Sequence, residues 1–185
     1  LIGRPQVIAA RVRRAGLRFH PGEDVPVVDP DNDPRFREYW TEYHGLMNRR
    51  GVTPDMAKAQ IRRSTTTIGA IAVRRGDADA MICGMVGRFD SHLENVRDVI
   101  GPARGGGTFA TLNALMLPGQ TIFVADTFVN DDPSAAEVAD IAAMAATAVR
   151  DFGMPPKVAF VSHSMFGSSD RPSVCKVPAA NEIFT

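Results

Sequence analysis

The sequence predicts an α/β fold with a largely parallel sheet, and two observations support this. Short apolar segments typical of strands, such as 78–84 and 157–162, alternate along the chain with longer segments of helical periodicity. Glycine or proline stands at the boundaries between them, for example at Gly51, Gly84 and Pro155. Strands that alternate with helices typically form parallel sheets, because a helix is the usual connection between parallel strands.

The first half of the chain is predicted to be mainly helical. Gly51 is a suitable left-handed residue for the end of one helix, and Thr53-Pro54 offers an N-cap and first-turn residue for the next. The segment 66–76 begins with β-branched residues, but its apolar character also fits a buried helix, which we favour. The expected elements are helices over 4–15, 34–50, 54–63, 66–76 and 91–101, a short apolar run over 25–29, a buried strand over 78–84 and a loop over 103–108.

The second half is predicted to contain a hairpin, a long helix and a final strand. A Pro-Gly pair separates the first two apolar runs, and that spacing is typical of an antiparallel hairpin. The long helix is capped either by Asp132, which precedes a proline, or by Ser134 with Glu137 in a capping box. The expected elements are strands over 112–118, 120–126 and 157–162, and a helix over 134–152.

Composition narrows the classes of function. The 185 residues are 44% apolar and 23% charged with a formal net charge of zero, so no basic field points to nucleic acid. No apolar run approaches the ~20 residues that a membrane span needs. The N-terminal residues lack the ordered regions of a signal peptide. Neither the two cysteines nor the four scattered histidines have a metal-ligand spacing. We therefore expect a cytoplasmic protein that binds no nucleic acid, membrane or metal.

Polar residues follow two of the predicted strands. In open α/β sheets, ligands bind outside the carboxyl ends of the strands, and hydroxyls, amides and free backbone N–H groups suit an anion or a phosphate. The same residue types are common in turns and caps, so an Asx-turn is the alternative interpretation of the aspartate, and local caps that of the serines. The candidate ligand-binding residues are Asp126, Thr127, Asn130, Ser162, Ser164, Gly167 and Ser168.

No catalytic residue is predicted. His163 stands between two serines, but neighbouring side chains in extended backbone point in opposite directions, and no G-x-S-x-G elbow is present. Gly105–Gly107 lacks the G-x-G-x-x-G pattern and is interpreted as a loop. No dinucleotide fingerprint occurs in the chain. Three arginine pairs are either solvated helix ends or positive charges for phosphates. They are Arg49-Arg50, Arg62-Arg63 and Arg74-Arg75.

The segment 125–170 resembles the phosphate acetyltransferase and butyryltransferase family. It has an aspartate-threonine after a strand, an asparagine and Pro133 before a long helix, and then a strand that ends in Ser-x-Ser with Gly-Ser soon after. The resemblance implies a two-lobed domain with three layers (α/β/α) and a mostly parallel sheet, similar to isocitrate and isopropylmalate dehydrogenases. Residues 1–185 are then a fragment of one such domain, incomplete at both ends. About 25–110 form one lobe and 111–185 part of the other.

Four segments are similar to the C-terminal domain of bacterial NADP-dependent malic enzymes. They are 39–57, 78–93, 124–133 and 162–170, so the likeness covers nearly the whole chain. It implies a domain that binds acetyl-CoA as an effector and helps to build a homo-oligomer. It implies no cofactor in this chain, because malate decarboxylation, NADP and the divalent metal belong to the N-terminal part of such enzymes.

Two departures from the acyltransferases lead us to expect that the domain does not transfer acyl groups. Glu94 and Asn95 stand where the family carries an Arg-Pro pair whose arginine holds the acyl phosphate, and a carboxylate there would repel that substrate. The sequence also stops before the family's C-terminal Ser-Arg and its aspartate base. Two alternatives stay open: an active phosphate acetyltransferase that moves acetyl between acetyl phosphate and coenzyme A, and a purely structural oligomerisation module.

Overall fold

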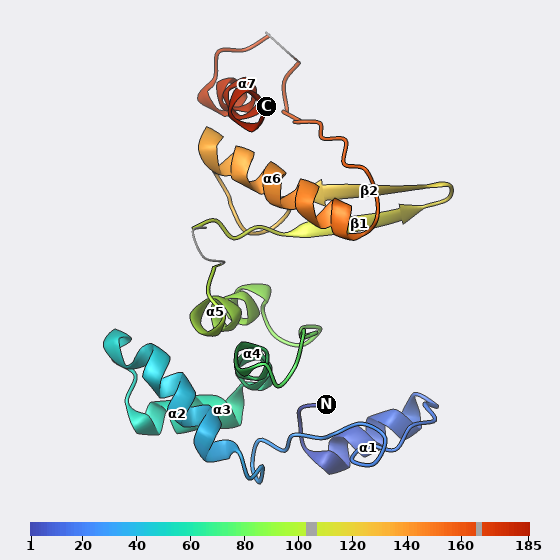
Figure 1. Ribbon diagram of the computed structural model, residues 1–185, viewed down its shortest axis with the longest axis vertical. Helices are drawn as coiled ribbons and strands as arrows, with labels where there is room; N and C mark the ends of the chain where they lie inside the picture. Colours follow the sequence, from blue (N-terminus) through green and yellow to red (C-terminus); the bar gives the residue numbers. More distant parts are fainter. Residues whose placement is uncertain (103–106, 166–167) are drawn as a thin grey trace. The chain divides into compact units, whose positions relative to one another are not determined.

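The computed structural model describes residues 1–102, 107–165 and 168–185 (Figure 1). The chain divides into two compact units, Leu1–Gly101 and Pro102–Thr185. The lobes predicted from the sequence, 25–110 and 111–185, stay a prediction.

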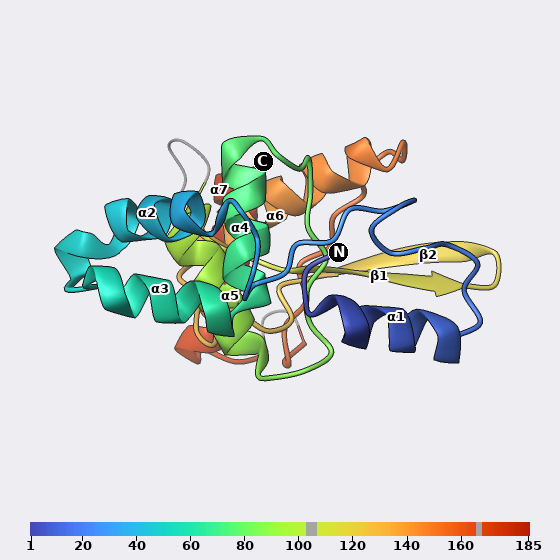
Figure 2. The ribbon, with the colours of Figure 1, turned by 90° about the horizontal axis from the view of Figure 1, so that it is seen from below.

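The first unit confirms the five helices expected from the sequence. Gly51 takes the left-handed conformation (φ 86°) after the 3-10 turn that follows the second helix, and Thr53 Oγ1 accepts a hydrogen bond from the Met56 N–H at 3.3 Å to cap the third. Helices α2 and α3 lie side by side (Figure 2). The elements are α1 (Pro5–Arg14), α2 (Phe36–Met47), η1 (Asn48–Arg50), α3 (Pro54–Arg63), α4 (Thr65–Arg75) and α5 (Phe89–Val99).

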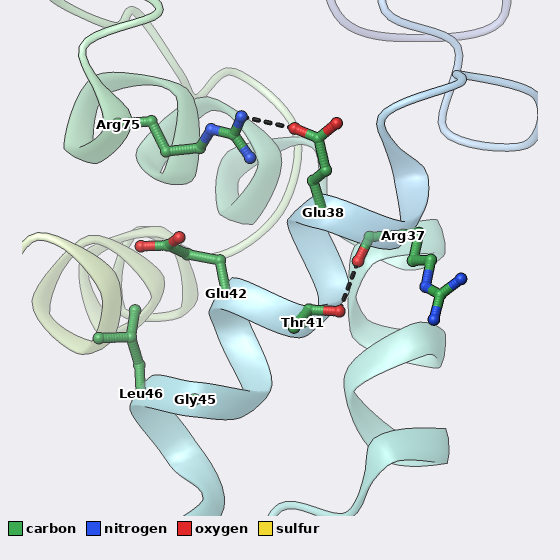
Figure 3. A pocket seen from close by; sticks show the side chains of 7 residues that line it. All are labelled: Arg37, Glu38, Thr41, Glu42, Gly45, Leu46 and Arg75. Carbon is green, nitrogen blue, oxygen red and sulfur yellow. Dashed lines mark hydrogen bonds and ion pairs between the residues drawn. The ribbon is translucent and has the colours of Figure 1, made fainter.

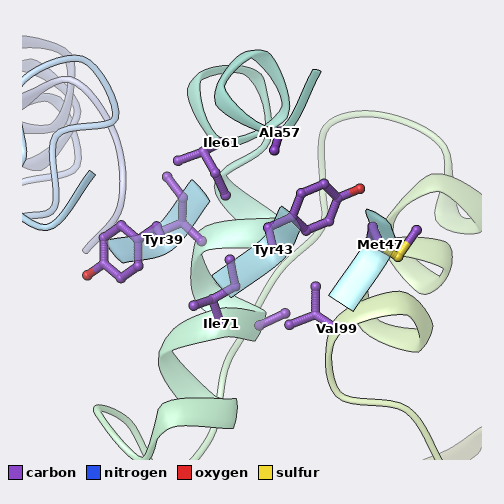
Figure 4. Packing of buried hydrophobic residues seen from close by; sticks show 9 residues of the cluster. Tyr39, Tyr43, Met47, Ala57, Ile61, Ile71 and Val99 are labelled. Atoms are coloured by element: carbon purple, nitrogen blue, oxygen red, sulfur yellow. The ribbon is translucent and has the colours of Figure 1, made fainter. Parts of the chain in front are cut away.

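An apolar core lies between α2, α3, α4 and α5 (Figure 4). Residues four apart lie on one face of a helix, so α2 contributes Tyr39, Tyr43 and Met47 in successive turns. Tyr39 and Ile61 are at most 1% exposed. Full burial of one such side chain stabilises the fold by about 1.5–3 kcal/mol, so this cluster fixes the packing of the four helices. Its buried members are Tyr39, Tyr43, Met47, Ala57, Ile61, Ile68, Ala70, Ile71 and Val99.

A buried polar network joins α3, α4 and α5 beside this core. Thr67 Oγ1 lies 2.8 Å from both Asn95 Oδ1 and Ser64 Oγ, and Gln60 Nε2 donates to Asn95 Oδ1 at 2.8 Å. Because a buried hydroxyl without a partner is costly, these contacts make burial of Thr67 compatible with a stable core.

The strand predicted over 78–84 is wrong. These residues have no regular secondary structure and most of their side chains are exposed. A strand needs a neighbour to accept and donate its backbone hydrogen bonds, and no described segment pairs with this one. The apolar run 25–29 makes two isolated parallel bridges, one between Val28 and Ile2 and one between Val25 and Pro21.

The second unit confirms the hairpin and the long helix. Strands β1 (Leu112–Leu117) and β2 (Gln120–Ala125) pair antiparallel around Pro118-Gly119. Helix α6 (Ala135–Asp151) begins at a capping box, because the Ser134 N–H donates to Glu137 Oε2 at 2.8 Å and the Glu137 N–H donates to Ser134 Oγ at 3.3 Å. This decides between the two predicted caps in favour of Ser134.

A further helix, α7 (Pro172–Phe184), packs along α6 and was not predicted. Lys176 ties the two together by donating to Pro133 O at 2.9 Å and pairing with Asp132. Pro172 at the first helical position was a usable signal, but Pro178 inside the segment is typical of a helix breaker.

The described residues contain one regular sheet, the two-stranded antiparallel sheet of β1 and β2. The strand predicted over 157–162 is wrong, since this segment has no ladder partner in the same unit. The fold is therefore mixed helix and strand with a small sheet, and the largely parallel sheet predicted from the sequence is not formed by the described part of the chain. Among those residues, no helix combines the length and the apolar character needed to cross a membrane.

Candidate functional site

Asp126, the first candidate residue, lies directly after β2 at the open end of the hairpin. Its Oδ1 accepts hydrogen bonds from the Thr111 N–H at 2.9 Å and from Thr111 Oγ1 at 2.6 Å. Its Oδ2 accepts from the Asn130 N–H at 2.8 Å and from Asn130 Nδ2 at 2.6 Å. The carboxylate thus joins the segment before β1 to the loop before α6.

These donors control the charge of Asp126. Partial burial by itself would raise the pKa of the carboxyl, but the four hydrogen bonds from Thr111 and Asn130 outweigh it and lower the pKa to about 2. Asp126 is therefore ionised at neutral pH and already holds four donors. The backbone N–H nearest in sequence that it accepts from is that of Asn130, four residues on, and not the N–H two residues on that defines an Asx-turn.

Thr127 and Asn130 belong to the same cluster. Thr127 Oγ1 donates to Asn113 Oδ1 at 2.6 Å, and the Thr127 N–H donates to Thr111 Oγ1 at 3.2 Å. Asn130 Nδ2 also donates to Phe109 O at 2.8 Å. Thr127 is exposed while Asn130 is half-buried, so the threonine is the member of this group that solvent or a ligand can reach.

Thr111 and Asn113 were not among the predicted site residues. Their positions near Asp126 could have been deduced from the register of the hairpin. If Leu117 pairs with Gln120 across the Pro-Gly turn, counting outward places Asn113 opposite Val124 and Thr111 just beyond the last pair, Leu112 with Ala125. Both polar residues therefore meet the Asp126-Thr127 pair at the end of the sheet.

The serine residues form a second, separate cluster. The Ser164 N–H donates to Ser162 Oγ at 3.1 Å, and Ser164 Oγ lies 2.8 Å from Ser168 Oγ. Ser168 Oγ also donates to Met165 O at 2.6 Å, which closes a short turn. Gly167 lies outside the described residues. No hydrogen bond in the described part of this unit joins the serine cluster to the Asp126 cluster.

The first unit has a small pocket of about 620 Å³ between α2 and α4 (Figure 3). Its charges largely neutralise one another. Arg75 lies 2.5 Å from Glu38 and 3.1 Å from Asp77, and the neighbouring Arg74 lies 3.4 Å from Glu42. Of the two arginines that line the pocket, Arg75 is already paired, whereas the guanidinium of Arg37 makes no hydrogen bond or ion pair with a described residue. Any free positive charge for a phosphate in this pocket therefore comes from Arg37.

The first unit also has a larger groove, of about 1140 Å³, which we call the α4 groove. Its floor includes Ile68 and Gly69 of α4, and Arg63 of the three arginine pairs lines it. By contrast, Arg50 pairs with Asp98 at 2.5 Å and Arg74 Nη1 donates to Val99 O at 3.0 Å. Together with Arg75, these two arginines hold helices of the first unit together, so their charge is already used within the protein.

Among the described residues, no group of three His, Cys, Asp or Glu side chains is arranged to hold a metal ion.

Comparison with known proteins identifies the class of protein. Residues 1–185 match the model of the family described as phosphate acetyl/butaryl transferase, and the chain belongs to that family. Its fold is phosphotransacetylase-like. It superposes with a TM-score of 0.82 on the EutD phosphotransacetylase from Staphylococcus aureus (19% identity, 99% of this chain and 54% of that chain). The TM-score is also 0.82 for a phosphotransacetylase from Streptococcus pyogenes (24% identity, 100% and 55%).

Within this family, the chain is similar to the C-terminal region of malic enzymes. It is 51% identical over 183 residues to the NADP-dependent malic enzyme of Escherichia coli (strain K12), covering 99% of this chain and 24% of that protein. It is 46% identical to the NAD-dependent malic enzyme of Rhizobium meliloti (strain 1021), with the same coverage. Identity to the phosphate acetyltransferase of Nitratidesulfovibrio vulgaris is 28%, over 99% of this chain and 25% of that protein. The chain spans about a quarter of the length of these relatives.

Proposed function

We propose that residues 1–185 belong to the regulatory, oligomer-forming domain of a malic enzyme, which binds acetyl-CoA and does not itself transfer acetyl groups. The observation that carries this proposal is the identity pattern, 51% to a malic enzyme against 28% to a phosphate acetyltransferase over the same residues. A chain that keeps the family fold but follows the malic enzymes in sequence is expected to share their division of labour.

Glu94 supports the absence of acetyl transfer. Its side chain is exposed on α5 and makes no hydrogen bond or ion pair with any described residue. By the family alignment it stands where the acyltransferases place the arginine that holds the acyl phosphate. A free carboxylate there repels a phosphate instead of neutralising it.

We propose as ligand-binding residues the seven candidates named from the sequence, and the structure suggests different roles for them. The seven are Asp126, Thr127, Asn130, Ser162, Ser164, Gly167 and Ser168. Asp126 and Asn130 hold the loop, because their polar groups are used within the protein. Thr127 and the Ser164–Ser168 pair present hydroxyls near the surface, which suit the phosphates or the amide groups of coenzyme A.

The remaining proposals concern a longer malic enzyme of which residues 1–185 would be one part. We propose that it oxidises and decarboxylates malate to pyruvate, that nicotinamide and divalent metal bind outside these residues, and that it works as a cytoplasmic homo-oligomer. The relatives include both NADP- and NAD-dependent enzymes at 51% and 46% identity, so this region does not decide between the two nucleotides. The three-layer fold with a mostly parallel sheet, like that of isocitrate dehydrogenase, is proposed for the complete domain.

Acetyl-CoA titration of the longer protein tests the proposal. Malate-dependent reduction of NADP or NAD should change with acetyl-CoA, and a one-site ligand at ~100 times its Kd should add ~2.7 kcal/mol to stability. Ser164→Ala should weaken both effects, while the control Ser173→Ala, an exposed serine on α7, should leave them unchanged. Unchanged turnover and unchanged thermal unfolding at millimolar acetyl-CoA would refute acetyl-CoA sensing.

A second candidate function, an active phosphate acetyltransferase, is favoured by the 28% identity to such an enzyme. It predicts formation of acetyl-CoA from acetyl phosphate and coenzyme A, lost in Ser164→Ala. A third, a structural oligomerisation module, predicts an oligomer in sedimentation experiments together with no response to acetyl-CoA. These assays, carried out on one preparation of the protein, therefore distinguish the three candidate functions.

A further inference from the structure

The charges of this chain cancel in total but are unevenly distributed along the sequence. Residues 1–22 contain five arginines and no aspartate or glutamate. Residues 105–149 contain five carboxylates and no lysine or arginine. A chain of zero net charge can therefore present two surfaces of opposite charge.

The positive charge lies at the C-terminal end of α1 and just after it. Four arginines there are exposed, and none of their guanidinium groups makes an ion pair or a hydrogen bond with a described residue. The helix dipole accounts for only about half a unit charge at this end, so most of the positive charge has no counter-charge. These four residues, which we call the α1 basic face, are Arg11, Arg13, Arg14 and Arg18.

The rest of the first unit leaves this part of α1 uncovered. Helix α1 lies apart from α2 to α5 in both views (Figure 1 and Figure 2). Val12 is buried, whereas Val7 is 47% exposed and Leu17 53% exposed beside the arginines. Protein–protein interfaces combine apolar contacts with a polar rim and are enriched in arginine, so this surface has the composition of an interface.

The negative charge lies at the start of α6 and just before it. Two of the three exposed carboxylates there accept hydrogen bonds from Ser134 and Thr108, but these donors are neutral and leave the negative charge in place. Asp132 is different, because it pairs with Lys176. Met144, further along α6, is 41% exposed and adds apolar surface. The three residues, which we call the α6 acidic face, are Asp131, Glu137 and Asp140.

We propose that the α1 basic face of one copy of the protein binds the α6 acidic face of a second copy, and that this contact helps to form the homo-oligomer. Four unpaired guanidinium groups then meet three carboxylates, and complementary charges of this kind speed the encounter of two proteins and fix its register. A nucleic acid or an anionic membrane would leave the acidic face unpaired and would be repelled by it. The inference rests on the proposed function for the homo-oligomer and names a surface that forms it.

Sedimentation velocity of the longer protein over a range of concentrations, without acetyl-CoA, tests the inference. Arg11→Glu with Arg14→Glu should raise the dissociation constant of the oligomer at least about tenfold, because repulsion replaces attraction across the contact. The matched control is Arg37→Glu with Arg49→Glu, at two exposed arginines without ion pairs in and after α2. It changes the net charge equally and should leave the dissociation constant within about twofold. Equal effects of the two double variants, or no effect of either, overturn the inference.

Exchanging the charges between the two faces identifies the partner surface. Asp131→Arg with Asp140→Arg should weaken association as much as the arginine reversal does. A chain with all four substitutions should return to within about threefold of the original dissociation constant, because the attraction is restored with its direction reversed. This recovery also shows that the reversed variants fold. Failure to recover overturns the inference, since the basic face then binds some other anion.

The same measurements separate this inference from the proposed function. An oligomer that withstands the charge reversals refutes only the inference, whereas an unsubstituted protein that is monomeric at every concentration refutes the oligomer as well. A reversal that lowers the Tm without changing association places the contact within one copy, and this too overturns the inference. Because acetyl-CoA is absent throughout, its role as an effector is judged independently.

Discussion

At the scale of single residues, Asp126 is the feature that most constrains the candidate site. It holds two loops of the second unit through four hydrogen bonds, and its partners come from 15 residues before it and four residues after it. The sequence predicted that Asp126, Thr127 and Asn130 lie at one rim together with the serines. The structure brings the first three together, but no described hydrogen bond joins them to the serines. The sequence alone could not show that both oxygens of the Asp126 carboxylate accept hydrogen bonds within the protein. That depends on Thr111, which is placed near Asp126 only by the register of the hairpin.

Replacing Asp126 by asparagine should destabilise the second unit. The amide group removes the negative charge and turns one oxygen into a donor that faces other donors, so we expect a loss of about 2 kcal/mol in the free energy of unfolding. Urea denaturation measures it. The control is Asp131→Asn, at an exposed carboxylate nearby, which should change stability by less than about 0.5 kcal/mol. Equal effects of the two substitutions would contradict the role assigned to Asp126.

The same carboxylate predicts a dependence on pH. The pKa of Asp126 is about 2 in the folded protein and 3.8 is its ordinary value, so the unfolded chain binds the proton more readily. The stability that Asp126 contributes is complete above about pH 4 and is lost as the pH falls toward 2. The difference in unfolding free energy between the native protein and Asp126→Asn should therefore shrink between pH 5 and pH 2. A difference that stays constant over this range is the contrary result.

At the scale of elements, local signals determined most helix boundaries. Thr53, Ser134 and Gly51 act where their residue types predicted, because caps depend on neighbours within a few positions. The segments 78–84 and 157–162 show the limit of such signals. Their apolar and β-branched residues favour strands, but a strand also needs a partner that no local pattern specifies. Pairing was predictable only for β1 and β2, where a two-residue turn sets the register.

The capping box of α6 gives a test of element stability. Ser134→Ala removes the acceptor of the Glu137 N–H and should cost about 1 kcal/mol, measured by thermal or urea unfolding. Ser173→Ala, on the first turn of α7 where the serine makes no capping contact, should cost much less. A loss as large at Ser173 would show that the effect comes from serine removal in general and not from the cap.

Two glycines of the α2 region should respond to alanine in opposite directions. Gly51 has φ 86°, where a side chain is strained, so Gly51→Ala should destabilise by about 1 kcal/mol. Gly45 lies within α2 with open space around its Cβ position, so Gly45→Ala should stabilise by about 0.4–1 kcal/mol. Unfolding midpoints compare the two, and a loss at Gly45 would contradict this account of α2.

At the scale of the whole molecule, the family was predictable from motifs spread over the chain, whereas the sheet was not. The motifs are local, but a parallel sheet forms only when distant strands meet, and the described residues supply no parallel ladder beyond two isolated bridges. The zero net charge read from composition also has a consequence that no single element shows. With a pI near 7.1, the chain has little electrostatic repulsion between copies at neutral pH.

Residues 1–185 prepared alone should therefore associate most strongly near pH 7. Exposed apolar side chains such as Ile82, Met116 and Val161 supply the attraction, and the absence of net charge removes the opposing repulsion. Light scattering at constant protein concentration should be greatest near pH 7 and lower at pH 5.5 and pH 9. Scattering that does not vary over this range would mean that charge does not limit association.

The way helices and strands pack against their neighbours in sequence also bears on how quickly the chain folds. The main contacts join consecutive elements: α2 with α3, α4 with α5, β1 with β2, and α6 with α7. The β1–β2 and α2–α3 pairs close short loops, so little chain entropy is lost before their contacts form, whereas the α6–α7 pair closes the longer connection 152–171. Chains of low contact order fold fast. During synthesis, each pair can assemble soon after it leaves the ribosome, without waiting for residues that are translated much later.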